Sequence, residues 1–185
     1  KVTPVYCYTS YPEAELFVNG KSQGRLKKDK NSKLDRYRLR WNNVIYEPGE
    51  LKVVAYDHQG NKAAEEIIRT AGQPYGFKIE ADKNSMADDG KDLVYYTVTM
   101  VDKDGNECPD ADDELTFNVT GAANFKAVCN GDATSLEVFG EPKMRLFHGK
   151  LVITVQSNGK KGPIHLTVNA PERKISTTRI DKPID

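Results

Sequence analysis

The side chains best suited to chemistry in this sequence are carboxylates, and one acidic segment stands out. Asp102-Lys-Asp104-Gly-Asn106 is similar to the first half of a calcium-binding loop, in which oxygen ligands alternate along the chain. A complete loop of this kind has a bidentate glutamate at its twelfth position, where this sequence has Asp113. Asp-Gly-Asn is also an ordinary hairpin turn, and we prefer that interpretation. We therefore expect no cofactor and no metal, with calcium as the alternative.

No set of residues has the spacing of an active site. A second acidic cluster consists of Asp110, Asp112, Asp113 and Glu114. A solvated loop accounts for it as well as a metal does. Glycoside hydrolysis requires two carboxylates held several ångströms apart in a cleft, and the sequence singles out no pair among its 27 Asp and Glu residues. The three histidines are widely spaced, at His58, His148 and His165. No serine, cysteine or metal motif accompanies them. We expect no catalytic residue here.

The three cysteines do not form a metal or disulfide framework. Cys7, Cys108 and Cys129 lack CxxC spacing, which disfavours zinc. Cys7 lies among apolar and aromatic residues and is expected to be a small buried side chain. Cys108 and Cys129 lie in the same half of the chain and could pair, but the odd count favours free thiols.

Aromatic residues gather in the first third of the chain and raise the possibility of sugar binding. In 36–41, Tyr37 and Trp41 alternate with arginines, so we expect both in a core and the arginines on a solvated face. Sugar rings stack on exposed aromatic faces. The aromatic set also contains Tyr6, and the better surface candidates for carbohydrate binding are Tyr8, Tyr11 and Tyr46.

Composition excludes several classes of partner. The 27 basic residues balance the 27 acidic ones, so net charge does not favour nucleic acid. No run of about 18 apolar residues is present, so we expect no membrane span. The chain opens at Lys1 without a signal peptide, and we expect it to be a piece of a longer protein.

Period-two alternation of apolar residues predicts an all-β fold of two tandem immunoglobulin-like β-sandwich domains. The boundaries are 1–72 for the first domain, 73–76 for a Gly- and Pro-containing linker, and 77–185 for the second. Asn19-Gly20 predicts a tight hairpin. The expected strands are 5–10, 14–18, 24–30, 36–41, 51–57, 63–70, 77–82, 94–100, 115–120, 151–155 and 164–168. Residues 121–149 are expected to be irregular.

Longer motifs in both halves resemble a known family. In the first half they are Glu15-Leu-Phe-Val-Asn-Gly-Lys-Ser-Gln-Gly24, Tyr37-Arg-Leu-Arg-Trp41 and Tyr46-Glu-Pro-Gly-Glu-Leu-Lys-Val-Val-Ala-Tyr-Asp57. They look like the C-terminal domains of bacterial β-galactosidase-like enzymes of glycoside hydrolase family 2. In the second half, Val101-Asp-Lys-Asp-Gly-Asn106 and Val128-Cys-Asn-Gly-Asp-Ala-Thr-Ser135 are similar to an invasin-like, bacterial immunoglobulin-type domain.

The resemblance implies a non-catalytic role. In this family the catalytic glutamates lie on an upstream (β/α)8 barrel, so that barrel, in the same parent chain, is the expected partner. A periplasmic or secreted parent acting on galactosides, and a homo-oligomer of that parent, are also implied. Two rival interpretations remain, a carbohydrate-binding module that targets the enzyme to polysaccharide and an adhesin-like spacer.

Overall fold

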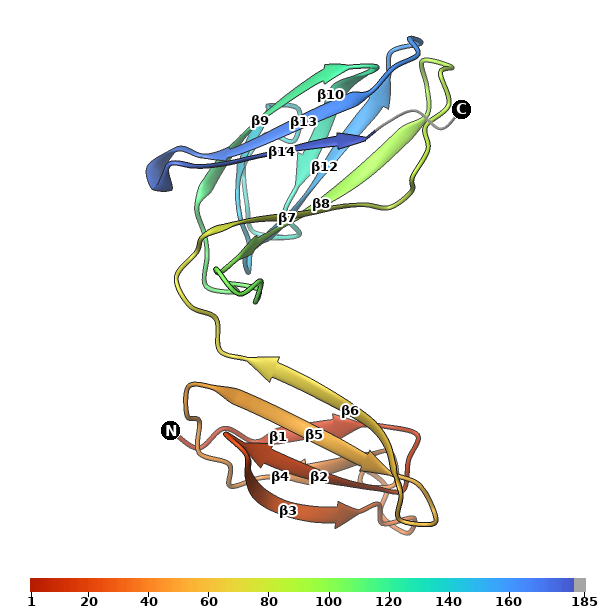
Figure 1. Cartoon of the computed structure of the whole chain (residues 1–185), viewed down its shortest axis with the longest axis vertical. Coiled ribbons are helices and arrows are strands. Elements are labelled where there is room, and N and C mark those ends of the chain that lie inside the picture. The colour runs from red at the N-terminus through yellow and green to blue at the C-terminus, as the bar shows by residue number, and fades with distance from the viewer. Residues whose placement is uncertain (182–185) are drawn as a thin grey trace. The chain divides into compact units, whose positions relative to one another are not determined.

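The chain consists of two antiparallel β-sandwich units. The computed structural model describes residues 1–181, and the first unit is Lys1–Thr70 while the second starts at Ala71 (Figure 1). Residues 73–76, the expected linker, belong to the second unit. The Gly72 N–H donates to the carboxylate of Asp102 (2.7 Å), and the Tyr75 N–H donates to the carbonyl of Val101 (2.9 Å).

The first unit contains a four-stranded sheet and a two-stranded one (Figure 1). Its strands are β1 (Val5–Tyr8), β2 (Glu13–Val18), β3 (Lys21–Lys27), β4 (Arg38–Trp41), β5 (Glu50–Tyr56) and β6 (Lys62–Arg69). The larger sheet has the order β3-β2-β5-β6, and β1 pairs with β4 in the smaller one. The hairpin predicted at Asn19-Gly20 is confirmed, because both residues have positive φ, 49° and 78°.

A small core lies between these two sheets. It consists of Ala14, Leu16, Val18, Leu39, Trp41, Val44 and Ala55. The Trp41 indole N–H donates to the carbonyl of Gly24 at 2.9 Å, which satisfies its one polar atom. The expectation that Tyr37 joins this core is wrong. Tyr37 precedes β4, outside the alternation that buries Leu39 and Trp41, and is 58% exposed.

The second unit is a sandwich of two four-stranded sheets. Its strands are β7 (Gly76–Ala81), β8 (Leu93–Val101), β9 (Glu114–Gly121), β10 (Ala123–Cys129), β11 (Lys143–Arg145), β12 (Lys150–Ser157), β13 (Ile164–Ala170) and β14 (Ile175–Asp181). A 3-10 turn at Pro171–Arg173 joins the last two. The sheets have the orders β10-β12-β8-β7 and β11-β9-β13-β14, and their facing sides enclose a large core.

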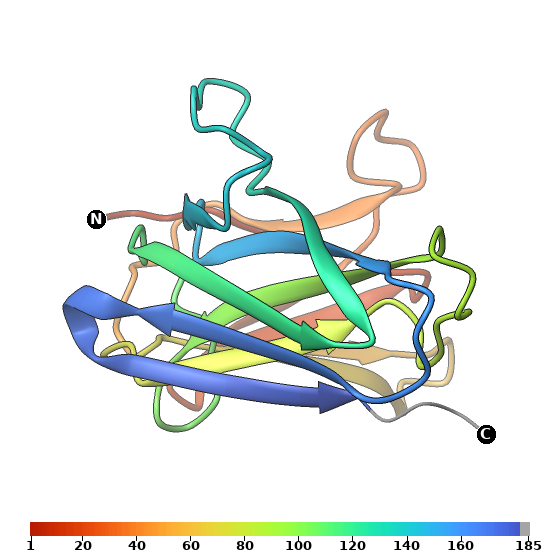
Figure 2. The same ribbon diagram turned by 90° about the horizontal axis from the view of Figure 1, so that it is seen from above.

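Three strands of this unit were not expected from the sequence. Residues 121–149 are not wholly irregular, because β10 and β11 lie within them. A register shift between Phe125 and Ala127 interrupts the period of two in β10. In β14 one face is only half-buried, so its apolar alternation is weak. Between β10 and β11 a loop projects beyond the strands that carry it (Figure 2).

Among residues 1–181, no helix has the length and apolar character needed to cross a membrane.

Candidate functional site

The outward face of the β1–β4 pair carries a mixed tyrosine and arginine surface. Cross-strand pairing places Tyr6 opposite Arg40 and Tyr8 opposite Arg38, while the alternate residues of both strands turn inward. The Arg38 guanidinium carbon lies 5.0 Å from the centre of the Tyr6 ring, and an Arg38 Nη1 donates to the Tyr8 hydroxyl at 3.3 Å. We call Tyr6, Tyr8, Arg38 and Arg40 the tyrosine–arginine face.

Charge and exposure on this face suit recognition of a polar ring. Tyr6 is 48% and Tyr8 68% exposed, and Arg38 lies over the Tyr6 ring and donates to the Tyr8 hydroxyl. Arg40 is instead paired with Asp35, with an Nε–Oδ1 distance of 2.6 Å. That pairing lowers the pKa of Asp35. Aromatic faces with a donor beside them can stack on a ring and bond its oxygens.

The three tyrosines predicted as sugar contacts do not form one surface in the structure. Tyr8 belongs to the tyrosine–arginine face. Tyr11 is half-buried and packs against the core of the first unit. Tyr46 is 55% exposed, and its hydroxyl lies 3.3 Å from that of Thr70. Tyr6 belongs to the same aromatic set but was not selected from the sequence as a surface candidate, although its alternation with Cys7 signals an outward position.

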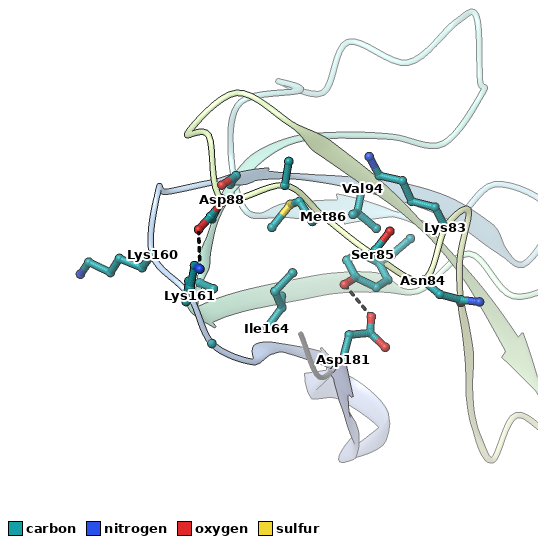
Figure 3. A pocket seen from close by; sticks show the side chains of 15 residues that line it. Lys83, Asn84, Ser85, Met86, Asp88, Val94, Lys160, Lys161, Ile164 and Asp181 are labelled. Atoms are coloured by element: carbon teal, nitrogen blue, oxygen red, sulfur yellow. Dashed lines mark hydrogen bonds and ion pairs between the residues drawn. The ribbon is translucent and has the colours of Figure 1, made fainter. Parts of the chain in front are cut away.

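The second unit has a pocket of about 410 Å³ with a mixed polar and apolar lining at one end (Figure 3). The β7–β8 and β12–β13 connections form its walls. Its carboxylates already have partners: Asp88 lies 3.8 Å from Lys161, and Asp181 accepts the Tyr96 hydroxyl at 2.7 Å and pairs with Arg179 at 2.9 Å. Burial first, and then Asp181, raise the pKa of Tyr96 far above its ordinary value. Both carboxylates of the pocket are thus engaged with neighbouring side chains.

The segment that is similar to a calcium loop is built as a turn. Asp102 Oδ1 accepts the N–H groups of Asp104 (2.9 Å) and Asn106 (2.8 Å), and Oδ2 accepts Gly72 N–H (2.7 Å). Asp113 is buried and bonded to Arg173 Nε at 2.6 Å. Within residues 1–181 no group of three or more His, Cys, Asp or Glu residues is placed to hold a metal ion.

Acid should weaken the second unit through Asp102. Hydrogen bonds, the one from Gly72 first, lower the pKa of Asp102 from 3.8 to about 2. Because the folded-state pKa is depressed, ionised Asp102 stabilises the fold at pH values above its unfolded pKa of 3.8. This stabilisation is lost as the pH falls towards 2. We expect Asp102→Asn to lower the urea midpoint at pH 7 and to flatten its fall between about pH 4 and pH 2. The matched control is the exposed Asp104→Asn, and equal pH profiles for both variants would contradict this assignment.

The cysteines are free thiols, as favoured from the sequence. Cys7 is half-buried, Cys108 buried and Cys129 exposed. Burial raises the pKa of the Cys7 and Cys108 thiols, which disfavours the nucleophilic thiolate at neutral pH.

The projecting loop between β10 and β11 carries apolar side chains that sequence reasoning did not single out. Leu136 is 97% exposed, and Val138 and Phe139 are 59% and 56% exposed. Glu137 fixes the loop by accepting the N–H of Arg145 at 2.9 Å. An ordered loop with an exposed apolar tip is typical of a contact surface.

Comparison with known protein families assigns the chain to one of them. Residues 77–179 match the family described as "Glycoside hydrolase family 2 C-terminal domain 5", which covers more than half of the sequence. The chain belongs to this family. Residues 1–64 match a second family, described as a domain of unknown function, DUF4982. The family expected from the motifs in the sequence is thereby confirmed.

Curated relatives of this family member are much longer proteins. The chain is 41% identical to "Beta-galactosidase BoGH2A" of Bacteroides ovatus over 167 residues, which are 90% of this chain and 19% of that protein. It is 29% identical to a "Putative beta-glucuronidase" of Formosa agariphila, again over 19% of that protein. The chain thus spans about a fifth of the length of these relatives.

Solved structures show the same fold within larger glycosidases. A glycosyl hydrolase family 2 member from Bacteroides cellulosilyticus superposes with a TM-score of 0.87 at 27% identity, covering 97% of this chain and 24% of that one. A β-glycosidase from Bacteroides vulgatus gives a TM-score of 0.88 at 29% identity, over 98% and 22%. The chain therefore corresponds to a non-catalytic accessory region of family 2 glycosidases, and the expected sandwich fold is confirmed.

Proposed function

We propose that this chain is the C-terminal accessory region of a β-galactosidase-like glycoside hydrolase and that it supports the catalytic barrel of the same polypeptide. The observation that carries this proposal is the 41% identity to a protein named as a β-galactosidase, of which the chain spans only 19%. We place the complete enzyme in the periplasm or outside the cell, acting on galactosides, and propose that it is a homo-oligomer.

The arrangement of carboxylates supports a non-catalytic role for the chain itself. A retaining or inverting glycosidase needs one carboxyl group with a raised pKa as proton donor and a second as nucleophile or base. The pocket of the second unit contains Asp88 and Asp181, and each is paired with a cation or a hydroxyl. The two carboxylates are therefore engaged by neighbouring side chains of the fold.

Deletion of the region from the complete enzyme tests the proposed support. We expect the truncated enzyme to lose activity on heating at a lower temperature than the full enzyme, because the contacts with this region are lost. The KM for a small galactoside is expected to change less, since the chemistry lies elsewhere. Equal inactivation temperatures and equal oligomeric states for the two proteins would overturn the proposal.

A second function, carbohydrate binding, is favoured by the tyrosine–arginine face. Arg38 is clamped between Tyr6 and Tyr8, and its Nε is buried without a protein acceptor. The exposed rings of Tyr6 and Tyr8 offer stacking faces to a sugar, and the Arg38 guanidinium beside them supplies positive charge for a sugar carboxylate. We also propose that the chain can bind calcium, which the binding experiment described next tests by comparing samples with and without the ion.

Binding should depend on Tyr8 and not on Tyr46. A glycan array followed by calorimetry, with and without calcium, measures binding to the chain. We expect Tyr8→Ala to weaken a galactoside or polysaccharide ligand about tenfold, because a stacked ring contributes roughly 0.5–1.5 kcal/mol beyond its buried area. Tyr46→Ala, an exposed tyrosine outside the tyrosine–arginine face, should leave the affinity unchanged. If no glycan on the array binds, or if both variants lose the same affinity, the carbohydrate-binding proposal is contradicted.

A further inference from the structure

The first unit has an apolar groove beside β1, with a volume of about 340 Å³. We call it the β1 groove. It is lined by residues 5–9 on one side and by residues of β5 and β6 on the other. Five consecutive residues come from β1 and its end. Because neighbouring side chains of a strand point to opposite faces, consecutive lining residues mean that the strand presents its edge to the groove.

The opposite wall is the inner face of a sheet. The β5 residues in the groove alternate, at Leu51, Val53 and Ala55. On β6 the inner-face residues are Ala64, Glu66 and Ile68, and Glu65 also lines the groove because β6 is the edge strand of its sheet. Their cross-strand pairs are Leu51 with Ile68, Val53 with Glu66 and Ala55 with Ala64. The groove is therefore bounded by an open strand edge on one side and an uncovered sheet face on the other.

This face is uncovered because the two layers differ in width. Four strands form one layer, and only β1 and β4 form the other. Ile68, which pairs with Leu51 on the inner face, is consequently 63% exposed. In the second unit both layers have four strands, and far more residues are buried although it is less than twice as long. The first unit lacks the equivalent of a strand in its smaller layer.

We propose that an extended segment from the remainder of the same polypeptide pairs as an added strand with the free edge of β1. This inference rests on the proposed function, which makes the chain a part of a longer enzyme. The added strand places alternate apolar side chains on Leu51, Val53 and Ile68, and it carries a lysine or arginine facing Glu66. Backbone hydrogen bonds to an open edge and side chains in the adjoining groove are how strand addition binds a segment.

The same polypeptide is favoured as the source because a tethered segment has a high effective concentration. Curated relatives contain about four-fifths of their length outside the matched region. Even a weak strand contact then forms intramolecularly. It would also increase the apolar area buried by a unit with a small core.

Hydrogen exchange and thiol labelling test the added strand. The complete enzyme is compared with the chain 1–185, following the β1 amides by mass spectrometry and the reaction of Cys7 with a maleimide. We expect the β1 amides to exchange and Cys7 to react about tenfold more slowly in the complete enzyme, because strand pairing must open first. The exposed Cys129 is the internal control for reagent access.

A pair of variants gives an independent readout. Ile68→Glu and Ile180→Glu change the same residue type at similar exposures, 63% and 55%. In the chain 1–185 neither should shift the urea midpoint appreciably. In the complete enzyme, only Ile68→Glu should lower it.

Three outcomes would overturn the proposal: unchanged β1 exchange in the complete enzyme, protection of Cys7 without protection of the β1 amides, or β1 protection that appears in the chain alone and rises with concentration. The last result would indicate pairing with a second copy. The deletion experiment measures heat inactivation and oligomeric state, and does not depend on protection of β1, so failure of the proposed function is recognised separately.

Discussion

Leu16→Ala is expected to lower the stability of the first unit strongly and to leave that of the second unit unchanged. Leu16 is fully buried in a core of few residues. A buried Leu→Ala change costs about 3 kcal/mol. A unit of this length has a free energy of unfolding on the order of 4–10 kcal/mol. Removal of a central side chain therefore takes away a large fraction of the stability of the first unit.

Trp41 makes this result easy to measure. It is the only tryptophan in the chain, and it lies in the core of the first unit. Its fluorescence during urea unfolding reports that unit selectively. Leu136→Ala makes the same chemical change at a position 97% exposed and should leave the Trp41 transition where it is. Equal urea midpoints for the two variants would show that the assigned core does not stabilise the unit.

Gly149→Ala is expected to destabilise the second unit by roughly 2–4 kcal/mol, since a strained backbone and a steric overlap add together. Gly149 has a φ of +74°, and a methyl group there would overlap the carbonyl oxygen of Cys108. The glycine also connects two segments, because its N–H donates to Ala111 O (3.1 Å) and its carbonyl accepts Met100 N–H (2.8 Å). The overlap is with backbone and cannot be relieved by a rotamer change.

A second glycine separates the two causes. Gly131 has a similar φ of +81°, but no atom lies within 4 Å of a methyl group built there. Gly131→Ala should therefore cost only the backbone strain, about 1 kcal/mol. Hydrogen exchange of the β12 amides measures the stability of the second unit in both variants. Comparable losses at the two positions would mean that the close approach of Cys108 to Gly149 has no energetic effect.

The sequence predicted those parts of the fold whose signal is local. Alternation of apolar residues located strands such as β2 and β12, and Asn19-Gly20 located a hairpin through its tolerance of positive φ. Alternation failed where geometry interrupts the period, as in β10, or where one face is only half-buried, as in β14. The predicted core position of Tyr37 was wrong because alternation does not reveal the residue at which a strand begins.

The candidate site was less predictable because it depends on contacts between distant residues. Tyr8 was named from its residue type, but Arg38, thirty positions later, holds its hydroxyl only through the pairing of β1 with β4. Asp181 reaches Tyr96 across 85 residues. The β1 groove arises from the unequal widths of two sheets. Sheet order is set by long-range pairing, which residue types alone do not determine.

Hydrolysis of a chromogenic β-galactoside by the purified chain is the most direct test of the non-catalytic role. The chain is assayed beside the complete enzyme, with Trp41 fluorescence showing that the first unit is folded. We predict turnover by the complete enzyme and none above background by the chain, because its pocket carboxylates Asp88 and Asp181 are held in ion pairs and hydrogen bonds. Turnover that co-purifies with the folded chain would contradict this account.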